Sequence, residues 1–91
     1  MADDLQTRFE HAAEAVQDLP ERPGNDTLLR LYALYKQATA GDVEGKRPGF
    51  TNPVGRAKYD AWAELEGTEP EVAMEQYVAL VDELRGAGPT W

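Results

Sequence analysis

The residues of this chain best suited to chemistry are Tyr32, Tyr35 and Lys36. They are related as i, i+3 and i+4, so a helix would place all three on one face. Phenol hydroxyls and an ammonium group can hydrogen-bond a phosphate, while the rings offer a surface for stacking. The spacing predicts a site for a phosphorylated aromatic ligand. The alternative is that both tyrosines pack in a helical core.

Positive charge is concentrated around these residues. The chain has a net charge of −8, yet residues 30–58 carry six basic and two acidic side chains, a local charge of +4. The remainder carries three basic and fifteen acidic side chains, a charge of −12. Because an acidic body is repelled by polyanions, we expect no nucleic-acid binding and no stable membrane insertion. The basic island suits a small polyanion, unless its charges are simply scattered and solvated.

Length and composition predict one domain, residues 1–91, large enough to form a core without disulfides. The chain has no cysteine, which fits a reducing compartment. Its start is acidic and lacks the apolar run of a signal peptide. No segment approaches the roughly 18 apolar residues of a transmembrane helix. We therefore expect a monomeric, cytoplasmic protein.

Apolar residues recur every three or four positions in four segments, which predicts four helices and no strand. The predicted helices span residues 5–19, 25–41, 52–67 and about 69–85. Pro20, Pro23 and Gly24 separate the first two because proline does not continue a helix interior. Residues 41–51 are glycine-rich and predict an ordered loop. Thr68 begins a sequence with capping-box spacing, which predicts the N-terminus of the fourth helix. The fold class is all-α.

No arrangement of residues points to catalysis. His11 is the only histidine, and no motif supplies it with a partner. The acidic pairs lie in polar stretches typical of solvated helix faces, and no metal-ligand spacing or glycine-rich phosphate loop occurs. We therefore expect a protein that is not an enzyme, with no catalytic residue, no metal and no cofactor.

Four short motifs follow one another between Phe9 and Trp62. They are Phe9 with Ala12-Ala13 and Val16, Tyr32-x-x-Tyr35-Lys36-Gln37-Ala38-Thr39-x-Gly41-Asp42, Arg47-Pro48-Gly49, and Ala57-Lys58-Tyr59-Asp60-Ala61-Trp62. In this order and spacing the chain resembles the acyl-CoA-binding protein family. The resemblance implies a four-helix bundle of that type. It also implies a non-catalytic intracellular carrier that binds long-chain acyl-CoA and presents it, in transient contacts, to acyl-CoA-using enzymes.

The resemblance also implies roles for individual residues. Tyr32 and Lys36 match positions that hold the 3′-phosphate region of coenzyme A, and Lys58 matches a second lysine on the same phosphate. Tyr77 matches a tyrosine that closes over the ligand, whereas Tyr35 is expected to serve packing more than contact. The apolar positions that match the ligand groove are Ala13, Leu28 and Leu29.

Three positions depart from the family pattern. Gln17 stands where many members carry a lysine, but it can still donate a hydrogen bond and remains among the expected ligand-binding residues. Tyr59 replaces a common tryptophan, and Val54 lies where some members have a basic residue. We expect these changes to affect affinity rather than the kind of ligand.

A second hypothesis is a helical protein-interaction module that does not bind lipid. Its support is the long acidic surface and the isolated aromatic residue Trp91.

Overall fold

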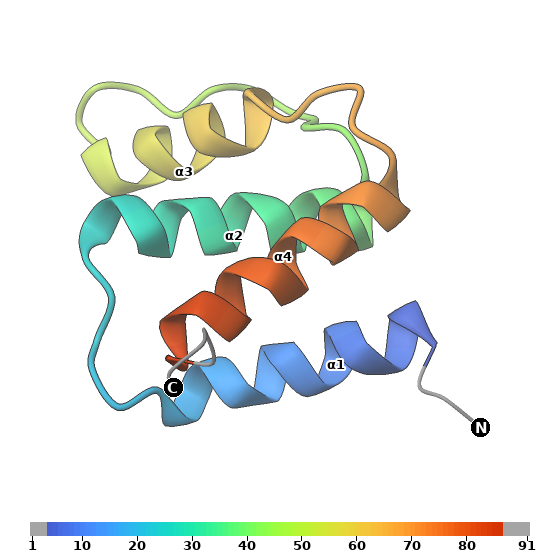
Figure 1. Ribbon diagram of the computed structural model, residues 1–91. Coiled ribbons are helices and arrows are strands. Elements are labelled where there is room, and N and C mark those ends of the chain that lie inside the picture. The colour runs from blue at the N-terminus through green and yellow to red at the C-terminus, as the bar shows by residue number, and fades with distance from the viewer. Residues whose placement is uncertain (1–3, 87–91) are drawn as a thin grey trace.

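Four α-helices and one short 3₁₀ turn form the described part of the chain, residues 4–86 of the computed structural model (Figure 1). The elements are α1 (Leu5–Ala15), η1 (Val16–Asp18), α2 (Asn25–Ala40), α3 (Pro53–Ala63) and α4 (Pro70–Leu84). The prediction of an all-α, four-helix fold is confirmed. Trp91, on which the second hypothesis partly depends, lies outside the described residues.

The helix starts follow from local chemistry. The side chain of Asp4 accepts a hydrogen bond from the backbone N–H of Thr7 at 2.8 Å, at the start of α1. The side chain of Asn52 accepts one from the backbone N–H of Gly55 at 3.0 Å, at the start of α3. Each bond satisfies a backbone donor that has no partner within the helix. Asn52 therefore opens the third helix as predicted.

The predicted boundaries need three corrections. The first α-helix ends at Ala15, and the chain tightens into η1 instead of continuing to residue 19. The third ends at Ala63 and is followed by a turn through Gly67. The capping-box prediction is wrong, because Glu69 is the N-cap residue of α4 and Pro70 is its first helical residue. Proline suits that position because its fixed φ matches a helix and its missing N–H is not needed there.

The core lies between α1, α2 and α4. Its buried members are Phe9, Ala12, Leu31, Leu34, Ala38, Ala73, Tyr77 and Val81. Figure 1 shows α4 crossing obliquely between α1 and α2, where these apolar faces meet. Among residues 4–86, no helix combines the length and the apolar character that a transmembrane span requires.

Helix α3 packs on α2 outside this core and has no fully buried residue. The loop between them runs back along α3, so that both helices point in the same direction (Figure 1). Polar contacts hold α3 and this loop together. Trp62 Nε1 donates to the carbonyl of Gly41 at 2.8 Å, and Arg47 forms a two-pronged pair with Asp60 at 2.8 and 2.7 Å. These contacts attach the loop to α3 and hold α3 beside the end of α2.

The end of α2 is locked to the turn before α4 by a buried amide. Gln37 is only 1% exposed, and its Nε2 donates to Asp42 Oδ1 and to the carbonyl of Thr68, both at 2.9 Å. Asp42 Oδ1 also accepts from the backbone N–H of Gly67 at 2.8 Å. Gly41 makes this close return possible, because its φ of 85° is readily adopted only by glycine. The contacts fix where α2 ends relative to α3 and α4.

These contacts make stability depend on the charge of Asp42. The N–H of Gly67, and then the amide of Gln37, lower the pKa of Asp42 below its ordinary value of 3.8. A depressed folded-state pKa contributes stability that is present above about pH 4 and lost as pH falls through the folded-state value.

We expect Asp42→Asn to lower the melting temperature at pH 7. The difference from the unchanged protein should shrink as pH falls below about 4, because the parent carboxylate then also loses its charge. Thermal unfolding followed by circular dichroism across this range is the measurement. Asp82→Asn, at an exposed position on α4, is the matched control. A difference that stays constant down to the lowest pH would contradict the assigned role of the Asp42 charge.

Candidate functional site

Two hollows meet along the exposed side of α2. The α2–α3 hollow, about 460 Å³ in volume, is lined by Arg22, Asn25, Leu28, Leu29, Tyr32, Pro53, Val54, Ala57 and Lys58. The α1–α2 hollow, about 360 Å³, is lined by Ala13, Val16, Gln17, Leu28, Leu31, Tyr32, Tyr35 and Tyr77. Both include Leu28 and Tyr32, so those two side chains form the boundary between them. Together the hollows make a groove that crosses α2 from α3 to α1.

The groove brings together eight of the nine residues predicted from the sequence. Leu29 and Lys58 lie in the α2–α3 hollow, and Leu28 and Tyr32 lie in both hollows. The α1–α2 hollow holds the remaining four, which are Ala13, Gln17, Tyr35 and Tyr77. Lys36 lines neither hollow and lies one helical turn beyond Tyr32.

Two cation–π pairs connect α2 with α3. The ammonium of Lys58, on α3, lies 5.3 Å from the centre of the Tyr32 ring on α2. The ammonium of Lys36, on α2, lies 5.0 Å from the Trp62 ring on α3. Tyr32 and Lys36 are four residues apart, as are Lys58 and Trp62, so the pairs are stacked about one helical turn, roughly 5.4 Å, apart. Two ammonium groups thus converge on one stretch of the seam.

Each ammonium is held loosely enough to be captured by an anion. A cation–π contact at an exposed site contributes only about 0.5–1 kcal/mol, whereas a hydrogen bond between charged groups contributes about 1.5–3 kcal/mol. Lys58 is exposed and Lys36 half-buried, so both can turn toward a ligand without unpacking the core. Trp62 is itself fixed by its hydrogen bond to the Gly41 carbonyl, which makes it a firm platform for Lys36.

Three aromatic rings are packed together beside the α1–α2 hollow, and two of them, Tyr35 and Tyr77, line it. The Phe9 ring centre lies 5.5 Å from that of Tyr35 and 5.1 Å from that of Tyr77, and the two tyrosine rings are 6.0 Å apart. Tyr77 is only 4% exposed, whereas Tyr35 is 42% exposed. Burial, and then the neighbouring phenol of Tyr35, raise the pKa of Tyr77 above 10.0. Tyr77 therefore stays a neutral hydroxyl that also packs in the core.

Several lining residues were missed from the sequence. Asn25 lies three residues before Leu28, and Val54 lies four residues before Lys58, so helical spacing from the predicted residues could have found both. Arg22 lies in the segment that connects η1 with α2, where no periodicity indicates which way a side chain points. Val54, which departs from the family pattern, therefore lines the α2–α3 hollow with an apolar side chain.

The described chain offers no set of metal ligands at this groove. Within residues 4–86, no three histidine or acidic side chains come together closely enough to hold a metal ion. His11 is exposed on α1 and does not line the groove.

A four-helix fold with a groove of tyrosine, lysine and leucine side chains defines a helical ligand-binding protein. Comparison with known proteins shows which family of ligand-binding proteins this chain belongs to. Residues 6–81 match the model of the family described as acyl CoA binding protein. The acyl-CoA-binding protein of Saccharomyces cerevisiae is 51% identical over 76 residues, which cover 84% of this chain and 87% of the relative.

Solved structures agree with the sequence comparison. Acyl-CoA-Binding Protein 2 from Oryza sativa superposes with a TM-score of 0.87 at 44% identity, covering 91% of this chain and 90% of the other. The acyl-CoA-binding protein of Moniliophthora perniciosa superposes with a TM-score of 0.84 at 40% identity, and the match covers 99% of this chain and 86% of the other. This chain belongs to the acyl-CoA-binding protein family. The expected family resemblance is confirmed.

Proposed function

We propose that this chain is a carrier of long-chain acyl-CoA, with the nucleotide end at the α2–α3 seam and the acyl chain in the groove across α2. One observation carries the proposal. This chain belongs to the family, and its Lys58–Tyr32 and Lys36–Trp62 pairs lie beside a groove lined by leucines and tyrosines. A charged site joined to an apolar one matches a ligand with a phosphorylated head and a hydrocarbon tail.

The phosphate is the group that the lysines would hold. A phosphomonoester such as the 3′-phosphate of coenzyme A carries close to two negative charges near neutral pH and has three strong acceptor oxygens. Lys36 and Lys58 approach the seam from opposite helices and supply positive charge from both sides. When Lys58 turns toward the phosphate, it leaves the face of Tyr32. That ring face would then be free to stack with adenine.

The acyl chain would lie over the apolar side chains of the groove. Leu28 is half-buried and shared by both hollows, so it would contact the ligand where head and tail meet. Ala13 is small and lines the α1–α2 hollow, which leaves room for a hydrocarbon chain beside Tyr35 and Tyr77. Each methylene removed from water would contribute up to about 0.8 kcal/mol. The tail would thus supply affinity, and the lysines would select the head.

The family and the yeast relative are described by acyl-CoA binding, and we propose that this chain binds and carries acyl-CoA and does not convert it. Gln17 lies in the α1–α2 hollow and would donate a hydrogen bond to the ligand. A cytoplasmic setting, a monomeric state, a single domain over residues 1–91 and transient contacts with acyl-CoA-using enzymes stay predictions.

Thermal unfolding with added ligand separates this proposal from the protein-interaction module. A ligand at 100 times its Kd stabilises the folded state by about 2.7 kcal/mol, so palmitoyl-CoA at that concentration should raise the melting temperature by roughly 10–20 °C. Coenzyme A alone should raise it less, because the tail contacts are missing. An unchanged melting temperature with palmitoyl-CoA would reject the carrier function and favour the module.

A further inference from the structure

The two aromatic rings that carry a lysine differ in their relation to the groove. Tyr32 lines both hollows, whereas Trp62 lines neither. Lys36, whose ammonium lies 5.0 Å from the centre of the Trp62 ring, does not line a hollow either. A ligand in the groove would therefore meet the Tyr32 ring directly, and it would meet Trp62 only through the ammonium of Lys36.

The Trp62 ring is fixed relative to the helix that carries Lys36. Its Nε1 donates to the carbonyl of Gly41 at 2.8 Å. Gly41 is the C-cap residue of α2, and its own N–H donates to the carbonyl of Gln37 at 3.2 Å. The ring of an α3 residue is thus attached to the end of α2, close to the turn from which the Lys36 side chain extends.

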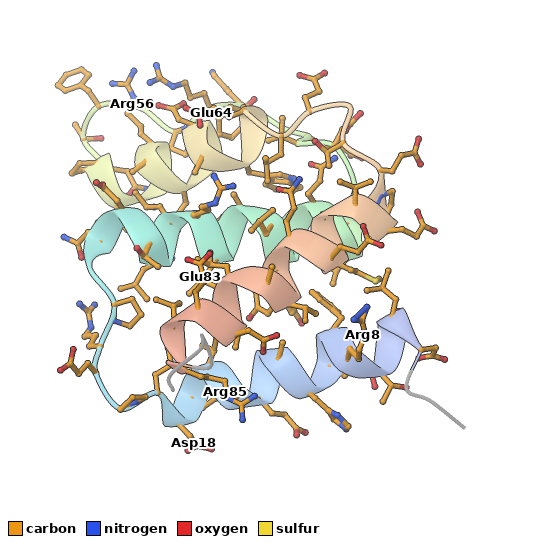
Figure 2. The ribbon with its side chains drawn as sticks, viewed as in Figure 1. Arg8, Asp18, Arg56, Glu64, Glu83 and Arg85 are labelled. Atoms are coloured by element: carbon orange, nitrogen blue, oxygen red, sulfur yellow. The ribbon has the colours of Figure 1, made fainter. Side chains whose placement is uncertain are left out.

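In the described part of the chain, no carboxylate forms an ion pair with Lys36. Two acidic residues lie in the second half of α3 and at its end. Asp60 is paired with Arg47 through both of its oxygens. Glu64, labelled in Figure 2, lines a different hollow between α2 and α3, of about 420 Å³. The contact with Trp62 therefore decides where the half-buried Lys36 places its ammonium.

An ammonium held by an aromatic ring can still bind an anion. The ring attracts the charge with its face, so the N–H donors that point away from the ring stay free for phosphate oxygens. Without the ring, the flexible four-carbon stem of Lys36 could turn into solvent, and ligand binding would have to immobilise it. With the ring, the ammonium is already placed at the seam when the protein folds.

We propose that Trp62 is a positioning residue for the coenzyme A phosphate, which acts through Lys36 and does not contact the ligand. The inference rests on the proposed function, because it requires the phosphate to bind at Lys36. Its readout is the phosphate preference, which we define as the affinity for palmitoyl-CoA divided by that for palmitoyl-dephospho-CoA. The two ligands differ only in the 3′-phosphate, so a general disturbance of the seam would weaken both and leave this ratio unchanged.

The test is calorimetric titration of Trp62→Leu with both ligands. This variant keeps an apolar side chain but loses the ring, and its phosphate preference should fall about threefold to tenfold, a difference of roughly 0.7–1.4 kcal/mol. Trp62→Phe keeps a ring and should lose less, about twofold to threefold. Thermal unfolding shows whether each variant is folded. If Trp62→Leu does not fold, the fall in Trp62→Phe decides the question.

Two controls isolate the contact between ring and lysine. Tyr59→Leu is the matched variant, because Tyr59 is also an aromatic residue of α3 that donates to a loop carbonyl, that of Gly45 at 3.1 Å. Neither of the two cation–π pairs among the described residues includes Tyr59, so this variant should keep the phosphate preference of the unchanged protein. In a Lys36→Ala background, Trp62→Leu should lower the preference no further, because the two changes remove the same interaction.

The outcomes are separable from those of the proposed function. An equal or increased phosphate preference in folded Trp62 variants would overturn the positioning role and leave the carrier function intact. A further fall in the Lys36→Ala background, or an equal fall in Tyr59→Leu, would also overturn it, because Trp62 would then act otherwise than through Lys36. If the unchanged protein bound both ligands equally, the assignment of the phosphate to the lysines would fail, and the positioning role with it.

Discussion

Replacing Lys36 by alanine is expected to weaken palmitoyl-CoA binding about 10- to 100-fold. The ammonium lies over Trp62 beside the seam, and with ligand present it would donate to the phosphate. A hydrogen bond between charged groups contributes about 1.5–3 kcal/mol, which gives the expected range. Folding should change little, because the cation–π pair with Trp62 contributes only about 0.5–1 kcal/mol to the ligand-free protein.

Lys46→Ala is the matched control, because it removes the same charge from an exposed position in the loop before α3. Calorimetric titration gives the affinities, and thermal unfolding gives the stability of each variant. The control should bind within about threefold of the unchanged protein, since exposed charges at a distance are largely screened by salt. If the Lys36→Ala protein unfolds more easily but binds palmitoyl-CoA with unchanged affinity, Lys36 stabilises the fold and does not bind the ligand.

Replacing Gln37 by glutamate is expected to lower the free energy of unfolding by about 3 kcal/mol or more. The change keeps the size of the side chain but replaces Nε2 by an oxygen. That oxygen would face Asp42 Oδ1 and the carbonyl of Thr68, both of which now accept from Nε2. Asp42 Oδ1 would keep only the N–H of Gly67, the carbonyl of Thr68 would lose its donor from Gln37, and a charge would be introduced at a position that is 1% exposed.

Urea unfolding at pH 7 measures the effect, and Gln76→Glu is the control. Gln76 is exposed on α4, so the same chemical change there should alter stability by no more than about 0.5 kcal/mol. The two variants have the same net charge, and a difference between them therefore reports the buried contacts of Gln37. Equal stabilities would mean that the end of α2 does not depend on this amide.

The sequence predicted α1, α2 and α4 well because each of them buries one apolar stripe. Leu31, Leu34 and Tyr77 lie in the core where a period of 3.6 residues places them. The helix ends were less predictable, because tertiary contacts decide them. Thr68 has the right spacing for a capping box, but its N–H donates to the carbonyl of Leu65 and its own carbonyl accepts from Gln37.

The candidate site was likewise predictable only in part, because the sequence predicts which residues share a helix face but not which residues of different helices make contact. The shared face of Tyr32 and Lys36 follows from spacing within one helix. The pairing of each with a residue of α3 does not, because it depends on the direction in which the following loop returns the chain. The family resemblance placed Lys58 near Tyr32, whereas the contact of Lys36 with Trp62 needed the structure.

The central claim is that one groove joins a phosphate-binding seam to an apolar surface. Calorimetric titration with palmitoyl-CoA, coenzyme A and palmitate tests it most directly, because the three ligands carry both parts, the head alone and the tail alone. We predict tight binding of palmitoyl-CoA, weaker binding of coenzyme A and negligible binding of palmitate. Equal affinity for palmitate and palmitoyl-CoA would contradict the account, since the lysines of the seam would then contribute nothing.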